Sequence, residues 1–295
     1  MNPGPVYLVD ASIYIFRAWF SVPDEFSSVD GEPSNAAYGF TGFLCSLLEQ
    51  ADSSHIGIAF DESLTTSYRN DIYPEYKANR DPAPEDLKRQ FKWAREIAES
   101  LGLQCFSDPY YEADDLIGTL SEYWRARGHS LCLVTSDKDL AQLIRKDDHW
   151  WDFARNKKLS HSMVAEKFGV QPEQMADYLA LMGDAVDNIP GVPGIGAKTA
   201  ATLLKHFGDI DAIRQGIEEV PHLSIRGAKS LYRILGDNWD AADLALKLTR
   251  IHTQVPSALK RPDIVRGEID EARLNRMFDQ LSFGAMLRRR CMQTG

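Results

Sequence analysis

The sequence predicts an α/β protein in which a mainly parallel sheet is followed by a mainly helical region. Up to about residue 170, short apolar segments alternate with longer amphipathic segments, as strands and helices do in a doubly wound sheet. Beyond that point the strand pattern fades and helical segments follow one another. We therefore expect an α/β region over residues 1–170 and a helical region over 171–295, which share an interface because no long flexible linker separates them.

Four apolar segments predict the strands, at residues 6–10, 55–61, 103–106 and 130–137. They contain many β-forming residues and no alternation of polar side chains, which indicates strands covered on both faces. Amphipathic segments predict helices at 86–102 and 113–128, the second ending in basic residues and Gly128. In the helical region we expect helices at 172–184, 196–208, 227–250 and 271–282.

Composition excludes several classes of protein. The 295 residues carry a net charge of −10, which argues against a nucleic-acid partner only if the acids are spread over the surface. The four cysteines are far apart and form no C-x-x-C pair, so they indicate neither a disulfide framework nor a zinc site. The apolar segments are too short to span a membrane and the N-terminus does not resemble a signal peptide, so we expect a cytoplasmic protein without membrane contact.

Carboxylates gather where the predicted strands end. Asp10, Asp61 and Asp137 follow three strands, and ligands of open parallel sheets bind beyond such ends. The segment "YYEADDLIG" adds three more acids at the start of a predicted helix, where the helix dipole alone would also favour negative charge. The candidate set is Asp10, Asp61, Glu112, Asp114, Asp115, Asp137, Asp139, Asp184 and Asp187, with Asp184 and Asp187 expected at the end of a helix.

So many carboxylates can share a crevice only if cations neutralise them or several are protonated. Oxygen ligands without accompanying histidine or cysteine favour Mg²⁺ or Mn²⁺ over zinc. Two divalent ions about 4 Å apart are the usual device for phosphodiester hydrolysis, one lowering the pKa of the attacking water and the other stabilising the departing 3′-oxygen. The acids therefore predict a two-metal phosphodiesterase site.

A glycine-rich hairpin is expected at residues 188–198, within "NIPGVPGIGAKTAATLLKHFG". Gly191, Gly194 and Gly196 free the backbone for a tight turn, and the next helix begins with exposed N–H groups beside Lys198. Such a hairpin grips a DNA backbone without reading its bases, although a plain turn between helices is the alternative.

The segment 67–90 mixes aromatic and basic side chains among prolines. Its members include Tyr68, Tyr73, Tyr76, Arg69, Lys77, Arg80, Lys88 and Arg89. This mixture fits stacking of an unpaired base and steering of phosphates. The alternative is a solvated loop with buried tyrosines.

Together these motifs resemble the 5′→3′ exonuclease/flap endonuclease family, the nuclease type found at the N-terminus of bacterial DNA polymerase I and in free-standing bacterial and phage enzymes. The resemblance covers roughly residues 6–260 and rests on "LVDAS" with Arg17, "AFD", "YKANR", "EADD", "VTSDKDLAQL" and "LMGDAVDNIPGVPGIGAKTA" in the family's order. It implies a PIN-like α/β nuclease core with an arch at about 63–90, and a helical subdomain with a helix–three-turn–helix (helix-hairpin-helix-like) motif. Tyr111 and Ser136 depart from the family's common glycines without removing a ligand.

The resemblance also implies roles for single residues. Asp10, Asp61, Glu112 and Asp114 would surround one metal ion and Asp137, Asp139 and Asp187 the other, with Asp115 and Asp184 close by or acting through water. Lys77 and Arg80 would contact the scissile phosphate, Tyr76 would stack on a base, and Asp115→Asn should abolish cleavage while DNA binding survives. The implied DNA contacts are Arg17, Tyr76, Lys77, Arg80, Gly191, Gly194, Gly196, Lys198 and Thr199, with K⁺ held by the backbone of Val192 and Ile195.

We therefore expect a metal-dependent, structure-specific 5′ nuclease acting on DNA with a 5′ end or flap, in bacterial replication or repair. Mg²⁺ would be its cofactor with Mn²⁺ as a substitute, and the protein would be a monomer. The length leaves no room for a polymerase domain, which predicts a free-standing enzyme. The alternatives are a non-catalytic DNA-binding module and a PIN-type ribonuclease; an aspartyl-phosphate phosphatase is excluded because "VDAS" lacks the second aspartate.

Overall fold

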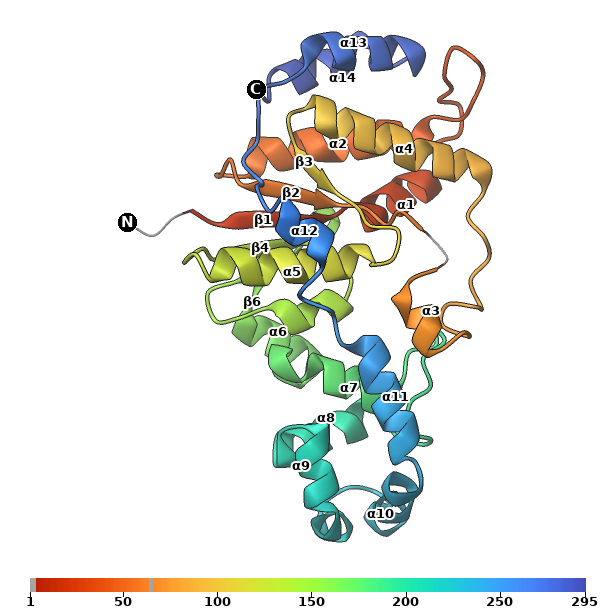
Figure 1. The fold of residues 1–295 in the computed structure, drawn as a ribbon, viewed down its shortest axis with the longest axis vertical. Helices are drawn as coiled ribbons and strands as arrows, with labels where there is room; N and C mark the ends of the chain where they lie inside the picture. The colour runs from red at the N-terminus through yellow and green to blue at the C-terminus, as the bar shows by residue number, and fades with distance from the viewer. Residues whose placement is uncertain (1–3, 64–65) are drawn as a thin grey trace.

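A six-stranded sheet forms the centre of the computed structural model, which describes residues 4–63 and 66–295 (Figure 1). The strands lie in the order β3 (Gln104–Phe106), β2 (Ile56–Ala59), β1 (Val6–Asp10), β4 (Leu131–Val134), β5 (His149–Asp152) and β6 (Lys157–Ser160). All neighbours are parallel except β5 and β6, which are antiparallel. The four predicted strands and the mainly parallel sheet are confirmed, whereas β5 and β6 were not predicted.

Helices cover both faces of the sheet because neighbouring residues of β1 point in opposite directions. Tyr7 and Val9 pack in the core that includes α2, and Val6 and Leu8 pack in the core that includes α5. One layer holds α1 (Ala11–Ser21), α2 (Asn35–Gln50) and α4 (Glu85–Ser100), and α13 (Glu271–Gln280) and α14 (Ala285–Met292) pack on the side of α4 and α2 away from the sheet. The other holds α5 (Ala113–Arg125), α6 (His161–Phe168) and α12 (Pro256–Lys260) (Figure 1).

The helical region extends below the sheet in Figure 1. It contains α7 (Met175–Met182), α8 (Ala197–Phe207), α9 (Ile210–Gln215), α10 (Ala228–Asp237) and α11 (Trp239–Thr249). The helix expected at 227–250 is interrupted at Asn238, which ends α10 and precedes α11. After α11 the chain returns to the sheet region, where α12 contacts α5, α13 contacts α4 and α14 contacts α2.

Short elements complete the fold. The helix α3 (Tyr68–Ile72) lies in the segment between β2 and α4, of which residues 64 and 65 fall outside the described residues. Short 3₁₀ helices are η1 (Asp139–Leu143), η2 (Phe153–Arg155), η3 (Pro172–Gln174) and η4 (Ile217–His222). Across the described ranges 4–63 and 66–295, no helix combines the length and the apolarity that a membrane span needs.

The end of α7 differs from the sequence-based expectation. The helix stops at Met182 because Gly183 adopts a positive φ of 76°. Asp184 and Asp187 therefore lie in the following turn, which the bridge between Asp184 and Ile189 closes, and not on a helix. This turn brings Asp187 to the edge of the sheet where β1, β2 and β4 end.

Candidate active site

A polar cavity of about 180 Å³ lies beyond the carboxyl ends of β1, β2 and β4. Seven of the nine candidate acids line it: Asp10, Asp61, Glu112, Asp114, Asp137, Asp139 and Asp187. Arg69, Tyr76, Lys77 and Arg80 of the segment between β2 and α4 line it as well. We call this cavity the acid pocket; Asp115 and Asp184 are not among its lining residues.

Hydrogen bonds fix the acids at the strand ends. Asp10 is the last residue of β1 and the N-cap of α1, and its Oδ2 accepts a bond of 3.0 Å from Thr135 Oγ1. Asp61 accepts bonds from Ser12 Oγ at 2.6 Å and from the backbone N–H of Ala113 at 2.9 Å. These contacts connect β1, β2 and the first turn of α5, so the acids of distant segments are held in one place. Ser12 and Thr135 stand inside the motifs "LVDAS" and "VTSDKDLAQL", but no supporting role was predicted for either residue from the sequence.

The three acids at the start of α5 point in different directions. Glu112 is the N-cap and forms a capping box with Asp115, whose Oδ2 accepts the backbone N–H of Glu112 at 3.2 Å. Glu112 and Asp114 face the acid pocket. Asp115 is fully buried, and its carboxylate lies against Arg69.

Arg69 and Asp115 form a bidentate ion pair. The Arg69 Nη1 and Nη2 atoms lie 2.7 and 2.9 Å from the two oxygens of Asp115, and the Arg69 side chain is only 3% exposed. Arg69 also donates to Glu112 Oε2 at 3.1 Å and to the carbonyl of Leu248 at 2.8 Å, and Asp115 accepts the backbone N–H of His252 at 2.8 Å. This network joins α3, α5 and the end of α11.

The pair gives both residues positions that the sequence interpretation did not anticipate. Arg69 was counted with the cations expected to steer phosphates, but it is buried in the protein. Asp115 was predicted as a catalytic and metal-binding acid, but its carboxylate is engaged by Arg69. Asp184 is likewise engaged, by Lys138 at 2.5 Å and by the backbone N–H of Val186 at 2.8 Å.

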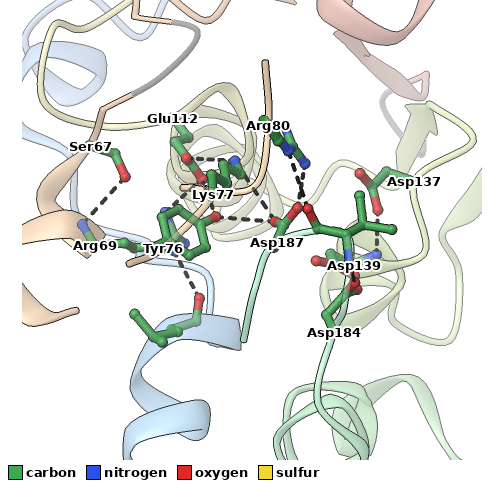
Figure 2. Close-up of polar contacts among 12 residues, drawn as sticks. Ser67, Arg69, Tyr76, Lys77, Arg80, Glu112, Asp137, Asp139, Asp184 and Asp187 are labelled. Atoms are coloured by element: carbon green, nitrogen blue, oxygen red, sulfur yellow. Dashed lines mark hydrogen bonds and ion pairs between the residues drawn. The ribbon is translucent and has the colours of Figure 1, made fainter. Parts of the chain in front are cut away.

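Figure 2 shows Tyr76, Lys77 and Arg80 converging on Glu112 and Asp187. Lys77 Nζ lies 2.7 Å from Glu112 Oε1 and 3.8 Å from Asp187 Oδ2, and Arg80 forms an ion pair with Asp187. The pKa of Glu112 is lowered: burial would raise it, but the charges of Lys77 and Arg69 outweigh the effect of burial. Lys77 has a φ of 57°, and its backbone N–H donates to the carbonyl of Asp187 at 2.9 Å.

Tyr76 is not placed to stack on a base in this arrangement. Its side chain is only 4% exposed, and its hydroxyl donates to Glu112 Oε2 at 3.1 Å and to Asp187 Oδ2 at 3.3 Å. The ring is therefore packed in the protein core while the hydroxyl bridges two acids of the pocket.

Five acids of the pocket have perturbed pKa values. Burial raises the pKa of Asp10 to about 7, with further contributions from the charges of Asp61 and Asp137. Burial likewise raises the pKa values of Asp61, Asp114, Asp137 and Asp139, and for Asp114 and Asp139 the charge of Asp137 adds to the increase. Within the described part of the chain, none of these five carboxylates forms an ion pair with a lysine or arginine.

The five acids fit a divalent cation by their chemistry. They supply only oxygen ligands, and the Oδ1 atom of Asp139 is buried without a hydrogen-bond partner. Among residues 4–63 and 66–295, however, no group of three or more acidic, histidine or cysteine side chains is gathered closely enough to hold a metal ion. Lys77 and Arg80 meanwhile neutralise Glu112 and Asp187. A bound ion would thus require small movements of these side chains.

The glycine hairpin lies next to the acid pocket. Ile189, just before it, lines the pocket, while Gly191 is packed so tightly that an added Cβ would lie 2.3 Å from the Gly183 nitrogen. Gly196 is the N-cap of α8, and Lys198 in its first turn is exposed. The side chains of Val192 and Ile195 are buried.

Two remaining candidates lie outside the pocket lining. Arg17 is exposed on α1, beside Tyr14 and Phe43. Thr199 lies half-buried in the first turn of α8.

The chain matches known proteins over most of its length. Residues 5–169 match the family described as "5′-3′ exonuclease, N-terminal resolvase-like domain", and residues 170–272 match "5′-3′ exonuclease, C-terminal SAM fold". A 5′-3′ exonuclease of Buchnera aphidicola subsp. Acyrthosiphon pisum is 35% identical over 89% of this chain and 91% of its own. DNA polymerase I of Rhizobium leguminosarum is 38% identical over 96% of this chain, which spans only 28% of that protein.

Solved structures share the fold at lower identity. The T5 5′-exonuclease with bound zinc superposes with a TM-score of 0.71 at 21% identity, covering 94% of this chain and 99% of its own. The catalytic core of Rad2 in complex with DNA substrate gives 0.61 at 17% identity, covering 99% and 92%. The fold expected from the sequence is confirmed, and the chain belongs to the 5′-3′ exonuclease family.

Proposed function

We propose that this chain is a metal-dependent, structure-specific 5′ nuclease that hydrolyses DNA phosphodiester bonds at a 5′ end or 5′ flap. The observation that carries the proposal is the acid pocket, where seven carboxylates from distant segments meet with Lys77 and Arg80. Membership of the 5′-3′ exonuclease family supports it. We place the protein in bacterial replication or repair, as a cytoplasmic monomer.

Asp10, Asp61, Asp114, Asp137 and Asp139 are the residues that would hold divalent cations, because they are buried acids without cationic partners. Glu112 and Asp187 would join them once Lys77 and Arg80 move. Bound Mg²⁺ or Mn²⁺ would supply Lewis-acid activation of water and stabilisation of the departing oxygen. The T5 flap endonuclease, one of the solved proteins that share this fold, has been crystallised with DNA and metal ions.

Lys77 and Arg80 would bind the scissile phosphate. Both are cations at the edge of the pocket, and both have a raised pKa. Burial would lower the pKa of Lys77, but the charges of Glu112 and Asp187 outweigh it. Burial would likewise lower the pKa of Arg80, but Asp187 outweighs it. The raised pKa values favour the charged forms of both side chains. Tyr76 and Arg69 hold Glu112 in place by hydrogen bonds.

The hairpin would bind duplex DNA away from the reacting bond. Its helix N-terminus and Lys198 offer backbone N–H groups and a cation to phosphates, and the carbonyls of Val192 and Ile195 could contribute to a K⁺ site. Arg17 and Thr199 complete the proposed contact set.

The test is cleavage of a 5′-end-labelled flap duplex with and without Mg²⁺, beside a blunt duplex, a single strand and an RNA flap of the same sequence. Metal-dependent cuts near the flap junction, absent from an Asp10→Asn/Asp137→Asn variant that keeps its melting temperature, would support the proposal. No cleavage in Mg²⁺ or Mn²⁺ with DNA still bound would favour a non-catalytic binding module. Cleavage of the RNA strand alone would favour a ribonuclease.

A further inference from the structure

A groove of about 650 Å³ lies beside the acid pocket. Its lining includes Tyr68, Leu246, Lys247, Arg250, Ile251 and His252. We infer that this groove binds the unpaired 5′ strand of a DNA substrate where that strand continues past the acid pocket. The inference rests on the proposed function and adds a second binding site to it.

The groove and the acid pocket share one wall. Along the end of α11 and the segment after it, Lys247 and Arg250 line the groove, Leu248 and Thr249 line the acid pocket, and Ile251 lines both. On α3, Tyr68 lines the groove while the next residue, Arg69, lines the pocket. A strand with a phosphate in the acid pocket therefore needs only to cross this wall to reach the groove.

The charges of the groove suit a phosphate backbone. Lys247 and Arg250 are exposed, and within the described ranges neither forms an ion pair with a carboxylate. Asp243, the acid in the lining, is paired with Arg214. The groove thus presents two exposed cations that are not engaged in an ion pair within the described residues, although the whole chain is strongly acidic.

The same groove offers aromatic faces to bases. Tyr68 and His252 line it, with ring centroids 6.3 Å apart, and His252 stacks on Tyr111 at 5.2 Å and 14°. The guanidinium of Arg69 lies 4.7 Å from the Tyr68 ring centroid, which holds that ring against the ion-pair network. Aromatic rings beside free cations are what binding of single strands without sequence preference requires.

The nature of the occupant follows from this combination. A small-molecule site of this size would bring several polar groups together on one ligand, whereas here the cations lie along an open apolar and aromatic surface. Duplex DNA presents its phosphates but keeps its bases stacked, so it would leave Tyr68 and His252 unused. A single strand uses both features.

The experiment measures DNA affinity of the full chain in EDTA, so that no strand is cut. Two fluorescent duplexes are compared, one with a 5′ flap of about ten nucleotides and one without a flap. The groove variant is Lys247→Glu/Arg250→Glu. The matched control is Lys146→Glu/Lys157→Glu, which makes the same charge change at two exposed lysines near β5 and β6.

We expect the groove variant to bind the flap duplex about tenfold more weakly than the control variant does, and its salt slope for that DNA to fall by about 1.4, because two single-strand phosphate contacts are lost. Affinity for the flapless duplex should match the control. Unchanged flap affinity, or equal losses for both duplexes, would overturn the inference. A His252→Leu variant should reduce quenching of a 2-aminopurine placed in the flap, and unaltered quenching would also count against it.

Failure of the proposed function gives a different result. If the unmodified protein cuts none of the metal-supplemented substrates, the nuclease assignment fails whatever the groove binds. If it cuts the flap duplex while the groove variant keeps full flap affinity, only the groove inference fails.

Discussion

Replacing Asp115 with asparagine should destabilise the protein as well as reduce its activity. The carboxylate is fully buried and binds Arg69 through both oxygens, at 2.7 and 2.9 Å. Removing one member of a buried ion pair costs about 3–5 kcal/mol, because the remaining charge has no partner. For a chain of this size we expect the melting temperature to fall by on the order of 10 °C.

The assay combines thermal melting with flap cleavage in three variants. Asp115→Asn and Arg69→Met should each melt early, and a double variant, Arg69→Met/Asp115→Leu, should recover part of the loss because apolar side chains can replace a buried pair. Recovery should be incomplete, since Arg69 also donates to the carbonyl of Leu248. Glu85→Gln is the control, because its ion pair with Lys88 is exposed to solvent and contributes little to stability.

The result that refutes this reasoning is specific. An Asp115→Asn protein that melts like the unmodified protein, yet has lost cleavage and kept DNA binding, would place Asp115 among the acids that act at the reacting phosphate. That is the outcome expected from the sequence alone. An Arg69→Met protein with unchanged stability would likewise show that the Arg69–Asp115 ion pair does not stabilise the fold around the acid pocket.

The other predictions concern the hairpin and the acids. Lys198→Ala should weaken binding to every duplex sequence and lower the salt slope by about 0.9, and an unchanged slope in anisotropy titrations would remove Lys198 from the phosphate contacts. Gly191→Ala should lower the melting temperature and duplex affinity, since its Cβ would meet the Gly183 nitrogen at 2.3 Å. Gly42→Ala, inside helix α2 with open space around its Cβ, should instead raise the melting temperature slightly and leave duplex affinity unchanged. Without metal, the pKa of Asp10 in the folded protein is raised to about 7, above the ordinary value of 3.8. The protonated Asp10 therefore contributes stability that is fully present below about pH 4 and is lost as pH rises through 7. Urea unfolding from pH 5 to 8 should show this loss, and Asp10→Asn should flatten it.

The sheet was predictable where strands are covered on both faces. The segments of β1, β2 and β4 are continuous apolar runs, because helices pack on either side of them. The strand β6, "KKLS", is an edge strand with two exposed lysines, so its sequence carries no such run. Its pairing with β5 depends on a turn at Asn156, which has a φ of 51°.

The acid pocket was predictable because strand ends of a parallel sheet meet at one edge. That rule brings Asp10, Asp61 and Asp137 together without knowledge of any side chain. It does not say which acid is paired with a cation. The partner of Asp115 lies 46 residues earlier in the chain, in a segment whose path no periodicity predicts.

The burial of Tyr76 is a second feature that the neighbouring residues in the sequence did not predict. The family resemblance implied a base-stacking role for Tyr76, and the sequence left a loop with buried tyrosines as the alternative. In the structure the ring is buried and its hydroxyl bridges Glu112 and Asp187. Burial of an aromatic side chain in a polar loop follows from tertiary packing, which local composition does not encode.

Under the proposed function, we expect from the charge balance of the acid pocket that two divalent cations bind rather than one. Arg69 is neutralised by Asp115, so the seven lining carboxylates face only Lys77 and Arg80, which leaves five negative charges when all are ionised. Two divalent ions would remove four of these charges, whereas one ion would leave three acids in close contact without compensation. Without metal, burial and the repulsion between neighbouring carboxylates raise the pKa values of Asp10, Asp114 and Asp139 together, which favours their protonated forms. Metal binding should therefore release protons, and the number released per protein should fall as the pH rises through 7.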